Sequence, residues 1–251
     1  MPDAWLVLPT YNEAENIEAF VAAARAKLPA SARVLIVDDS SPDGTGEIAD
    51  RLAADDENVS VLHRQVKEGL GPAYIAGFRR ALAEGADLVL EMDSDFSHDP
   101  AYLPRLLEAA RRADVVLGSR YVPGGGVSDW GPLRKAISRG GSAYARLLLG
   151  VDVQDLTGGF KCFRREVLEA IDFDSIQARG YAFQVEMTYR AIRAGFEVVE
   201  VPIVFRDRRA GTSKMDRAIV AEAIWRVPAL RFGPQPAEKA KSTPGQRRYT
   251  F

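Results

Sequence analysis

Short apolar runs alternate with longer amphipathic stretches through the first half of the chain, and this alternation limits the possible folds more than any other feature of the sequence. The amphipathic stretches have helical spacing, as in residues 17–28 and 103–110. Asn12 and Glu15 have the spacing of a capping box, which predicts a helix beginning near Asn12. Regular alternation of strand and helix favours a parallel sheet with helices on both faces. The apolar runs predicted to form its strands are residues 5–8, 34–37, 59–62, 88–90 and 115–117.

Polar residues follow four of these predicted strands, in the segments 9–13, 38–44, 93–95 and 119–121. Taken singly, each segment has the composition of an ordinary turn. The carboxyl ends of parallel strands meet at one edge of a sheet, and this edge is where α/β proteins bind their ligands. We therefore expect the four segments to lie together and to form a site.

Two carboxylates one residue apart, Asp93 and Asp95, follow the fourth predicted strand and precede Pro100. Carboxylate oxygens are ligands that Mg²⁺ and Mn²⁺ prefer, and these ions keep coordination positions open for phosphate oxygens. The pair therefore indicates a divalent-metal site for phosphate chemistry. An Asp that follows a strand is also a common helix cap, so both interpretations stay open from this segment alone.

The composition is that of one large α/β domain, with 251 residues of which 47% are hydrophobic. The formal net charge of -2 gives no electrostatic reason to expect nucleic-acid binding. Because Cys162 is the single cysteine, no internal disulfide is possible and a reducing compartment is expected. We expect neither a signal peptide nor a membrane-spanning helix, since no run approaches about 20 apolar residues. Residues 233–251 are predicted to be a flexible tail.

The segment 134–149 combines basic and apolar residues at helical spacing. Its cations include Arg134, Arg139 and Arg146. This pattern is typical of a helix that lies on an anionic membrane surface. A core-facing helix with a solvated basic face explains the same pattern equally well.

Residues 198–205 have the composition of a strand, and Pro202 within them predicts an edge position or a bulge. Four cations follow in the segment 206–214, beside small residues. The amphipathic run 219–230 comes next and contains Pro228, which is expected to kink a helix.

In their order along the chain, these motifs resemble those of the inverting glycosyltransferases of family 2, and among them the polyprenol-phosphate (dolichol-phosphate) mannose synthases. The resemblance extends over most of the chain. The motifs shared with many family 2 enzymes are at 9–13, 37–39 and 93–95. The motifs typical of the polyprenol-phosphate branch are Gly-Ser-Arg-Tyr at 118–121, Arg-Lys at 134–135 and Gly-x-Ser-Lys at 211–214, with further similarity at 69–71 and 155–160.

The resemblance implies an α/β GT-A fold with a Rossmann-like, mostly parallel central sheet, helices on both faces, and C-terminal amphipathic helices. Residues 1–232 would form one domain, in which 1–120 bind the nucleotide sugar and 121–232 bind the acceptor phosphate. The resemblance also implies transfer of mannose from GDP-mannose to a polyprenyl monophosphate. This transfer would invert the anomeric carbon and would need a divalent metal, Mg²⁺ or Mn²⁺.

Carried over by position, the resemblance assigns roles to individual residues. The guanosine would be held by Pro9, Tyr11, Glu13, Val37 and Asp39. The metal on the diphosphate would be bound by Asp93, which also contacts the nucleotide, and by Asp95, with Ser97 at the position where some relatives have a glutamine ligand. The donor diphosphate and the acceptor phosphate would be bound by Arg120, Arg134, Arg208, Ser213 and Lys214. Asp155 is either a site residue beside the sugar or acceptor, or the cap of a loop.

Two other functions remain compatible with these residues. A related family 2 enzyme would transfer glucose from UDP-glucose, or another sugar, to the same lipid phosphate, because few base contacts decide the donor. An inactive nucleotide-sugar binding module would instead regulate a membrane partner. For the enzyme, we expect a peripheral position on the cytoplasmic face of the membrane, with residues 137–149 and 219–232 nearest the lipid and with a separate membrane-anchoring subunit as a candidate partner.

Overall fold

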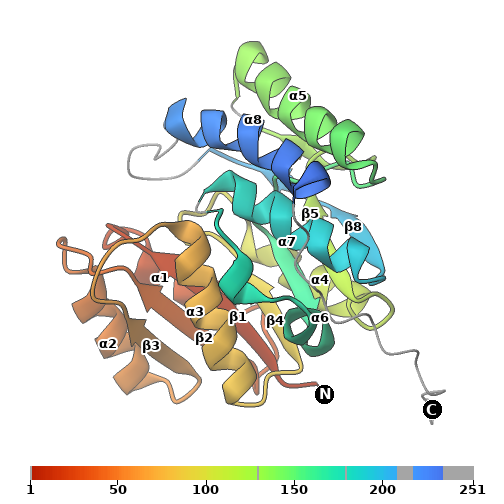
Figure 1. Cartoon of the computed structure of the whole chain (residues 1–251). Coiled ribbons are helices and arrows are strands. Elements are labelled where there is room, and N and C mark those ends of the chain that lie inside the picture. The colour runs from red at the N-terminus through yellow and green to blue at the C-terminus, as the bar shows by residue number, and fades with distance from the viewer. Residues whose placement is uncertain (1, 129, 179, 208–216, 234–251) are drawn as a thin grey trace, which may run out of the picture.

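The computed structural model describes residues 2–128, 130–178, 180–207 and 217–233 of the chain, and these residues are built around one seven-stranded sheet (Figure 1). The strands lie in the order β3-β2-β1-β4-β7-β5-β8. Their bounds are β1 (Ala4–Thr10), β2 (Arg33–Asp38), β3 (Val59–His63), β4 (Leu88–Glu91), β5 (Val115–Ser119), β7 (Lys161–Arg164) and β8 (Val198–Pro202). All five strands expected from apolar runs are therefore confirmed.

One strand of the sheet, β7, runs against the others. It pairs antiparallel with β4 on one side and with β5 on the other, whereas β1, β2, β3, β4, β5 and β8 run in the same direction. The sheet is thus mostly parallel, as the resemblance implies. Alternation of strand and helix alone did not predict β7, because Lys161–Arg164 is short and has a cation at each end. The strand β8 lies at an edge of the sheet, where a proline such as Pro202 is tolerated.

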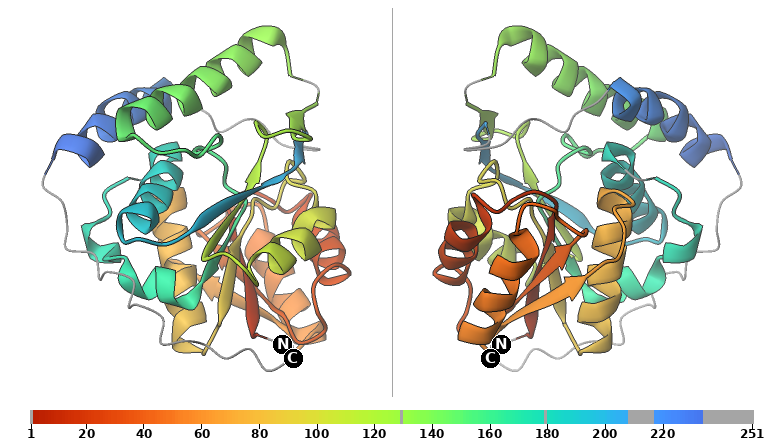
Figure 2. Two further views of the ribbon diagram at one scale, coloured as in Figure 1. Left: turned by 90° about the vertical axis from the view of Figure 1, so that its right-hand side faces the viewer. Right: turned by 90° about the vertical axis from the view of Figure 1, so that its left-hand side faces the viewer.

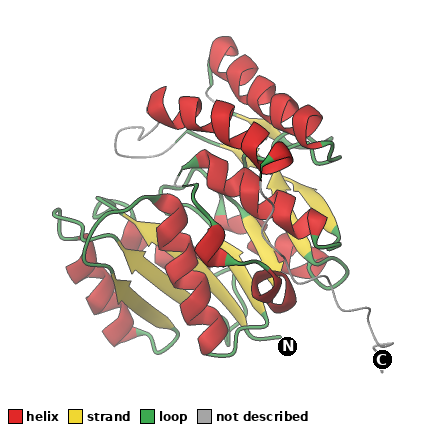
Figure 3. Ribbon diagram, in the orientation of Figure 1, coloured by secondary structure: helices red, strands yellow, loops and turns green. Residues whose placement is uncertain are grey.

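Helices cover both faces of the sheet (Figure 3). The α-helices are α1 (Ile17–Arg25), α2 (Thr45–Asp55), α3 (Leu70–Ala83), α4 (Leu103–Ala109), α5 (Pro132–Leu149), α6 (Arg165–Ala170), α7 (Tyr181–Arg193) and α8 (Arg217–Phe232), with short 3-10 turns η1 (Pro100–Tyr102) and η2 (Phe173–Ser175). Alternate side chains of β1 belong to two separate apolar clusters: Trp5 and Val7 pack on the α3 and α7 face, and Leu6 and Leu8 pack on the α1 and α4 face. Burial on both faces explains why these strands are continuous apolar runs.

The helix expected to begin near Asn12 begins four residues later. The N-cap of α1 is Asn16, and its side chain makes no capping hydrogen bond. Asn12 instead has a φ of 55°, and its N–H donates to Ser41 Oγ at 3.1 Å. Asn tolerates this left-handed conformation better than most residues. The contact with the loop after β2 therefore replaces the capping box that the spacing suggested.

Two helices, α5 and α8, lie beyond the edge at which the parallel strands end (Figures 1 and 2). They pack against each other, and α8 also packs on α7. A small parallel pair, β6 (Gly126–Val127) and β9 (Val204–Phe205), lies close to them. The helix α8 continues through Pro228, so this proline does not end it. Among the helices that the structure describes, none combines the length and the hydropathy that crossing a bilayer requires.

Candidate active site

The loops that follow β1 and β2 are joined by hydrogen bonds, so the polar segments after these two strands do meet at one edge. The Asp39 N–H donates to the carbonyl of Thr10 at 3.0 Å, and Thr10 Oγ1 donates to Asp38 Oδ1 at 3.2 Å. Asp38 also accepts hydrogen bonds from the main chain and the hydroxyl of Ser41. These contacts hold the first two polar segments in one position relative to each other.

Two of the residues expected to bind the nucleotide have cations beside them. The Lys67 ammonium lies over the Tyr11 ring, 3.7 Å from its centroid. Arg64 forms an ion pair with Asp39. Burial raises the pKa of the Asp39 carboxyl, and Arg64 opposes this effect. Arg64 and Lys67 follow the third strand, and sequence reasoning did not assign either of them to the site.

The other residues expected at the nucleotide are mainly part of the framework. Glu13 accepts a hydrogen bond from Asn16 Nδ2 at 2.9 Å, and its own N–H donates to Thr45 Oγ1 at 2.9 Å. The Val37 side chain is fully buried in the apolar core. Pro9 lies within β1 opposite Val37. Pro9 and Val37 can therefore take part in binding chiefly by shaping the main chain at the sheet edge.

Asp93 and Asp95 lie directly after β4, and neither caps the helical turn that follows. That cap is Asp99, whose Oδ1 accepts from the Ala101 N–H at 2.9 Å. Asp95 is buried and accepts from the Ser97 N–H at 2.9 Å, while the Asp93 side chain is 38% exposed. The helix-cap interpretation is thus wrong for this pair, although Asp95 does order its own loop.

The surroundings of Asp93 are buried and aromatic. One carboxylate oxygen, Oδ1, lies 3.5 Å from the Tyr74 hydroxyl, and Oδ2 lies 3.8 Å from His98 Nδ1. His98 is itself buried between the rings of Phe160 and Phe205. Burial lowers the pKa of His98 to about 4, so the ring is neutral at pH 7. His98 was not among the site residues expected from the sequence.

The donor set at Asp93 and Asp95 fits a metal that is shared with a substrate. Within the described ranges, no cluster of three or more His, Cys, Asp or Glu side chains could hold an ion alone. Mg²⁺ is commonly bound by one or two carboxylates together with substrate phosphates, and two adjacent carboxylates match this requirement. The main chain of Ser97 is engaged on both sides, since its N–H donates to Asp95 and its carbonyl accepts from the Arg206 N–H at 3.0 Å.

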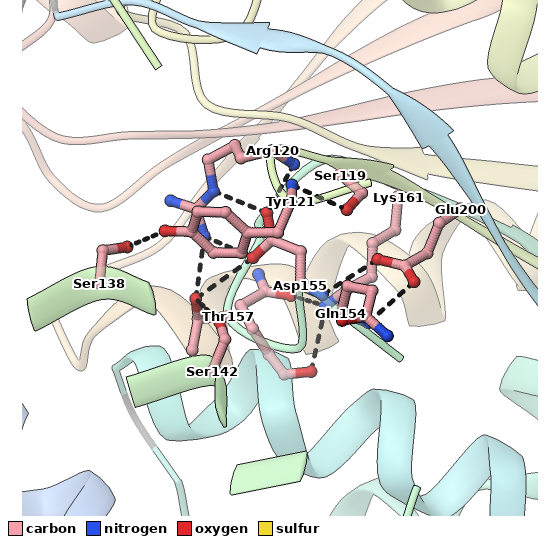
Figure 4. A network of polar contacts seen from close by, with 11 residues as sticks. Ser119, Arg120, Tyr121, Ser138, Ser142, Gln154, Asp155, Thr157, Lys161 and Glu200 are labelled. Atoms are coloured by element: carbon pink, nitrogen blue, oxygen red, sulfur yellow. Dashed lines mark hydrogen bonds and ion pairs between the residues drawn. The ribbon is translucent and has the colours of Figure 1, made fainter. Parts of the chain in front are cut away.

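Arg120 and Asp155 form a buried ion pair at the end of β5 (Figure 4). Arg120 Nε donates to Asp155 Oδ2 at 2.7 Å, Nη2 donates to Oδ1 at 2.6 Å, and the Arg120 main-chain N–H donates to Oδ2 at 2.9 Å. The side chains are 7% and 0% exposed. Asp155 therefore neutralises and orients a cation that was expected to face phosphate, and this bidentate geometry is the strong form of the arginine–carboxylate contact.

Hydrogen bonds of the same network connect α5 to the edge of the sheet (Figure 4). Thr157 Oγ1 accepts from Arg120 Nη2 at 2.9 Å and lies 3.2 Å from the Ser142 hydroxyl on α5. The Tyr121 hydroxyl donates to Ser138 Oγ on α5 at 2.6 Å. The carboxylate of Glu200, on β8, accepts from the main-chain N–H of Asp155 at 3.0 Å. These contacts bind α5, the loop before β7 and the edge strand together.

Of the two expected phosphate-binding arginines that the structure describes, Arg134 is the more exposed. Its guanidinium lies over the Trp130 ring at 4.2 Å and 3.0 Å from Asp207. Trp130 also lies within 5.9 Å of the Arg120 guanidinium, so the two arginines share one aromatic neighbour. Arg208, Ser213 and Lys214, and the predicted tail from residue 234 onward, lie outside the described residues.

Glu91 and Lys161 form a second buried ion pair at the end of β4, two residues before Asp93 in the chain. The two residues face each other across β4 and β7, with Lys161 Nζ 3.2 Å from Glu91 Oε1, and both side chains are fully buried. Burial raises the pKa of Glu91 to about 7, and Lys161 opposes this shift. Lys161 Nζ also donates to the side-chain and main-chain oxygens of Gln184. The signal available in the sequence was a glutamate directly after the apolar run 88–90.

The chain is similar to known proteins in both sequence and fold. The model of the family described as Glycosyl transferase family 2 matches residues 5–172. The chain is 52% identical over 227 residues to undecaprenyl-phosphate mannosyltransferase of Micrococcus luteus, which covers 90% of this chain and 92% of that protein. It is 48% identical over 224 residues to polyprenol monophosphomannose synthase of Mycolicibacterium smegmatis. This match covers 88% of this chain and 84% of that protein. Glucosyl-3-phosphoglycerate synthase from Mycobacterium tuberculosis, solved with Mn²⁺, UDP-glucose and phosphoglyceric acid, has a TM-score of 0.66 at 20% identity, with 94% of this chain and 81% of that chain covered.

Proposed function

Because the chain belongs to glycosyl transferase family 2, we propose that it transfers mannose from GDP-mannose to a polyprenyl monophosphate with inversion of the anomeric carbon. The chain is a glycosyltransferase with an α/β fold of the GT-A type. One observation supports the proposed substrates. Over about nine-tenths of its length, the chain is 52% and 48% identical to two enzymes named as polyprenol-phosphate mannosyltransferases. The alternatives are a family 2 enzyme that transfers glucose or another sugar to the same lipid phosphate, and an inactive nucleotide-sugar binding module.

Asp93 and Asp95 would stabilise the diphosphate leaving group through a bound metal. In the proposed reaction the bond from mannose C1 to the donor diphosphate breaks, and a bond from C1 to an oxygen of the acceptor phosphate forms. Asp93 and Asp95 would hold Mg²⁺ or Mn²⁺, which stabilises the negative charge that develops on the diphosphate. The M. tuberculosis neighbour, whose complex contains Mn²⁺ and a nucleotide sugar, supports a divalent ion in this fold.

The acceptor would not need a strong general base, because a phosphate monoester is already anionic near neutral pH. The task of the protein is then to bring two anions together, which cationic side chains achieve through charge-assisted hydrogen bonds. We assign this role to Arg120 and Arg134, and from the sequence to Arg208, Ser213 and Lys214. Arg134 is the more adaptable of the first two, since its partner Asp207 is exposed.

The nucleotide would bind over the ends of β1 and β2. The Tyr11 ring offers a face to the guanosine, and Asp39 offers a carboxylate that can accept from N–H groups of the base. Lys67 and Arg64 already lie against these two groups, which supports a position for the base or the diphosphate there. Pro9, Glu13 and Val37 would shape the main chain around the nucleoside.

The test of this function is mannosyl transfer from labelled GDP-mannose to several polyprenyl phosphates, with Mg²⁺, with Mn²⁺ and with a chelator. We expect a lipid-phosphate mannose product that forms only with a metal present. UDP-glucose serves as the competing donor in a parallel series. Faster turnover of UDP-glucose would overturn the mannose assignment, and binding of nucleotide sugars without any turnover would favour the regulatory module.

We further propose that the protein works peripherally at the cytoplasmic face of the membrane, with a separate membrane subunit as a candidate partner. The support is a stripe of exposed apolar residues at helical spacing on α5, namely Leu133, Ile137, Tyr144 and Leu147. Basic residues flank this stripe, and such helices bind anionic lipid surfaces. On α8, Trp225 and Phe232 are exposed as well.

Replacing Leu147, which is 77% exposed, with Asp should weaken binding to vesicles that contain anionic lipid. The reason is that a charge would replace apolar area that inserts between the head groups. Co-sedimentation with vesicles, with and without polyprenyl phosphate, measures the effect. The matched control is Val66→Asp, because Val66 is also an exposed apolar residue but follows β3, the edge strand on the far side of the sheet from β5 and β8. Equal binding by the wild-type protein and the Leu147 variant would contradict membrane contact through α5.

A further inference from the structure

Tyr74 brings a buried hydroxyl group to Asp93. The helix α3 connects the parallel strands β3 and β4, so it begins at the sheet edge where these strands end. Tyr74 lies near the beginning of α3, and its side chain is fully buried. Its hydroxyl oxygen lies 3.5 Å from Asp93 Oδ1. A helix that packs on the sheet therefore places one polar group directly at the expected metal site.

The ring of Tyr74 packs against two other aromatic rings. It stacks on Phe183 with a centroid distance of 6.0 Å and an interplanar angle of 3°, and on Phe78 at 5.7 Å and 26°. All three side chains are fully buried. The hydroxyl oxygen lies on the long axis of the ring, so packing that fixes the ring also fixes the position of this oxygen. The aromatic contacts thus direct the hydroxyl at Asp93.

Two glycines hold α3 close to its neighbours. A Cβ at Gly71 would lie 2.6 Å from the carbonyl oxygen of Ala178, in the loop before α7, and a Cβ at Gly77 would overlap the Val7 side chain on β1. Glycine is unfavourable inside a helix, so this close approach accounts for both residues. They come three residues before and three residues after Tyr74. The tyrosine therefore has little freedom to move away from Asp93.

The hydroxyl of Tyr74 is explained by its contact with Asp93 rather than by packing. A phenylalanine would pack against the same rings, and a buried hydroxyl destabilises the fold unless it is hydrogen-bonded. Among the described residues, Asp93 supplies this hydrogen bond. A tyrosine hydroxyl can donate and an ionised carboxylate can only accept, so Tyr74 is the donor. Because this donor is neutral, it orients the carboxylate without cancelling the negative charge that a metal ion needs.

We propose that Tyr74 is a positioning residue, whose hydroxyl orients the Asp93 carboxylate toward the divalent ion. This assignment rests on the proposed function, in which Asp93 and Asp95 hold the ion. Carboxylates that bind metals are in turn hydrogen-bonded, and loss of such an outer partner typically weakens metal binding by about ten- to a hundredfold. The distance of 3.5 Å is long for a hydrogen bond between oxygens, so we expect an effect at the lower end of this range.

The first measurement is the affinity for Mn²⁺ in the presence of GDP, by electron paramagnetic resonance, for the wild-type protein and for Tyr74→Phe. The substitution removes only the hydroxyl oxygen and keeps the ring. We expect about tenfold weaker Mn²⁺ binding, with a melting temperature close to that of the wild-type protein. Unchanged Mn²⁺ affinity would overturn the assignment. Failure of the wild-type protein to bind Mn²⁺ would overturn it together with the metal site.

The second measurement separates positioning from general distortion of the site. The affinity for GDP is measured by titration calorimetry, once with Mn²⁺ and once with a chelator. We expect Tyr74→Phe to lose GDP affinity only with Mn²⁺, because Tyr74 acts on the nucleotide through Asp93 and the ion. Equal loss under both conditions would overturn the assignment.

The matched control is Tyr189→Phe on α7. Tyr189 is a buried tyrosine of the same apolar cluster, and its described ring contact is with Arg193. We expect this variant to bind Mn²⁺ and GDP as the wild-type protein does. A loss of Mn²⁺ affinity equal to that of Tyr74→Phe would show that removal of any hydroxyl from this cluster has the same effect, and would overturn the assignment.

Failure of the proposed function would give a different result. If the wild-type protein binds Mn²⁺ but uses UDP-glucose faster than GDP-mannose, the donor proposal fails. Tyr74→Phe is then compared with the wild-type protein in the presence of UDP. Weaker Mn²⁺ affinity of the variant there supports the role of Tyr74, and equal affinity overturns it.

Discussion

Replacing Asp155 with alanine should lower the free energy of unfolding by about 3–5 kcal/mol, the usual cost of removing one partner of a buried ion pair. The substitution removes the carboxylate that accepts from three N–H groups of Arg120 and leaves a guanidinium that is only 7% exposed without this counter-charge. Denaturation in urea, followed by circular dichroism, measures the change.

The matched control is Asp207→Ala. Asp207 pairs with Arg134 at 3.0 Å, but the arginine and aspartate side chains are 39% and 45% exposed. Exposed pairs of this kind contribute about 1 kcal/mol or less. If the Asp155 and Asp207 variants lost the same small amount, the Arg120 network would not stabilise the sheet edge in the way its burial indicates.

Replacing Asp95 with asparagine should reduce metal-dependent transfer by about a thousandfold while the fold is retained. Asparagine can still accept the hydrogen bond from the Ser97 N–H, so the loop keeps its contact, but the charge that would bind the metal is lost. The measurements are kcat/KM for transfer and the affinity for Mn²⁺ in the presence of GDP.

Asp99→Ala provides the comparison within the same loop. Asp99 caps the turn η1, so its loss should cost about 1 kcal/mol of stability. Transfer by this variant should stay within a few-fold of the wild-type rate. Turnover of the Asp95 variant at the wild-type rate would show that Asp93 and Asp95 do not hold a catalytic metal.

The sequence predicted the parts of the fold that depend on local pattern. Each of the five apolar runs became a strand because both faces of the sheet are covered, and the polar segments after β1 and β2 met at one edge for the reason expected of parallel strands. The capping box at Asn12 failed because a contact with Ser41, on another loop, decided the local conformation. Propensity is overridden where tertiary contacts are strong.

The contacts that organise the site were beyond such reasoning, because they join residues far apart in the chain. Arg120 and Asp155 are 35 residues apart, and spacing alone left Asp155 open between a site residue and a loop cap. The structure gives Asp155 a third role, as the partner of Arg120. Glu91 and Lys161 are likewise joined only by the register of β4 and β7, which no local period encodes.

The position of β7 in the middle of the sheet has a consequence for the order in which the chain can fold during synthesis. In the described sheet β5 pairs only with β7 and β8, and β4 pairs with β1 and β7. When residue 120 leaves the ribosome, β5 has been made but has no strand to join, and β4 forms an open edge of the kind that promotes aggregation. The sheet closes only after residues 161–164 emerge and insert between them, so late synthesis completes the region that carries Asp93 and Arg120.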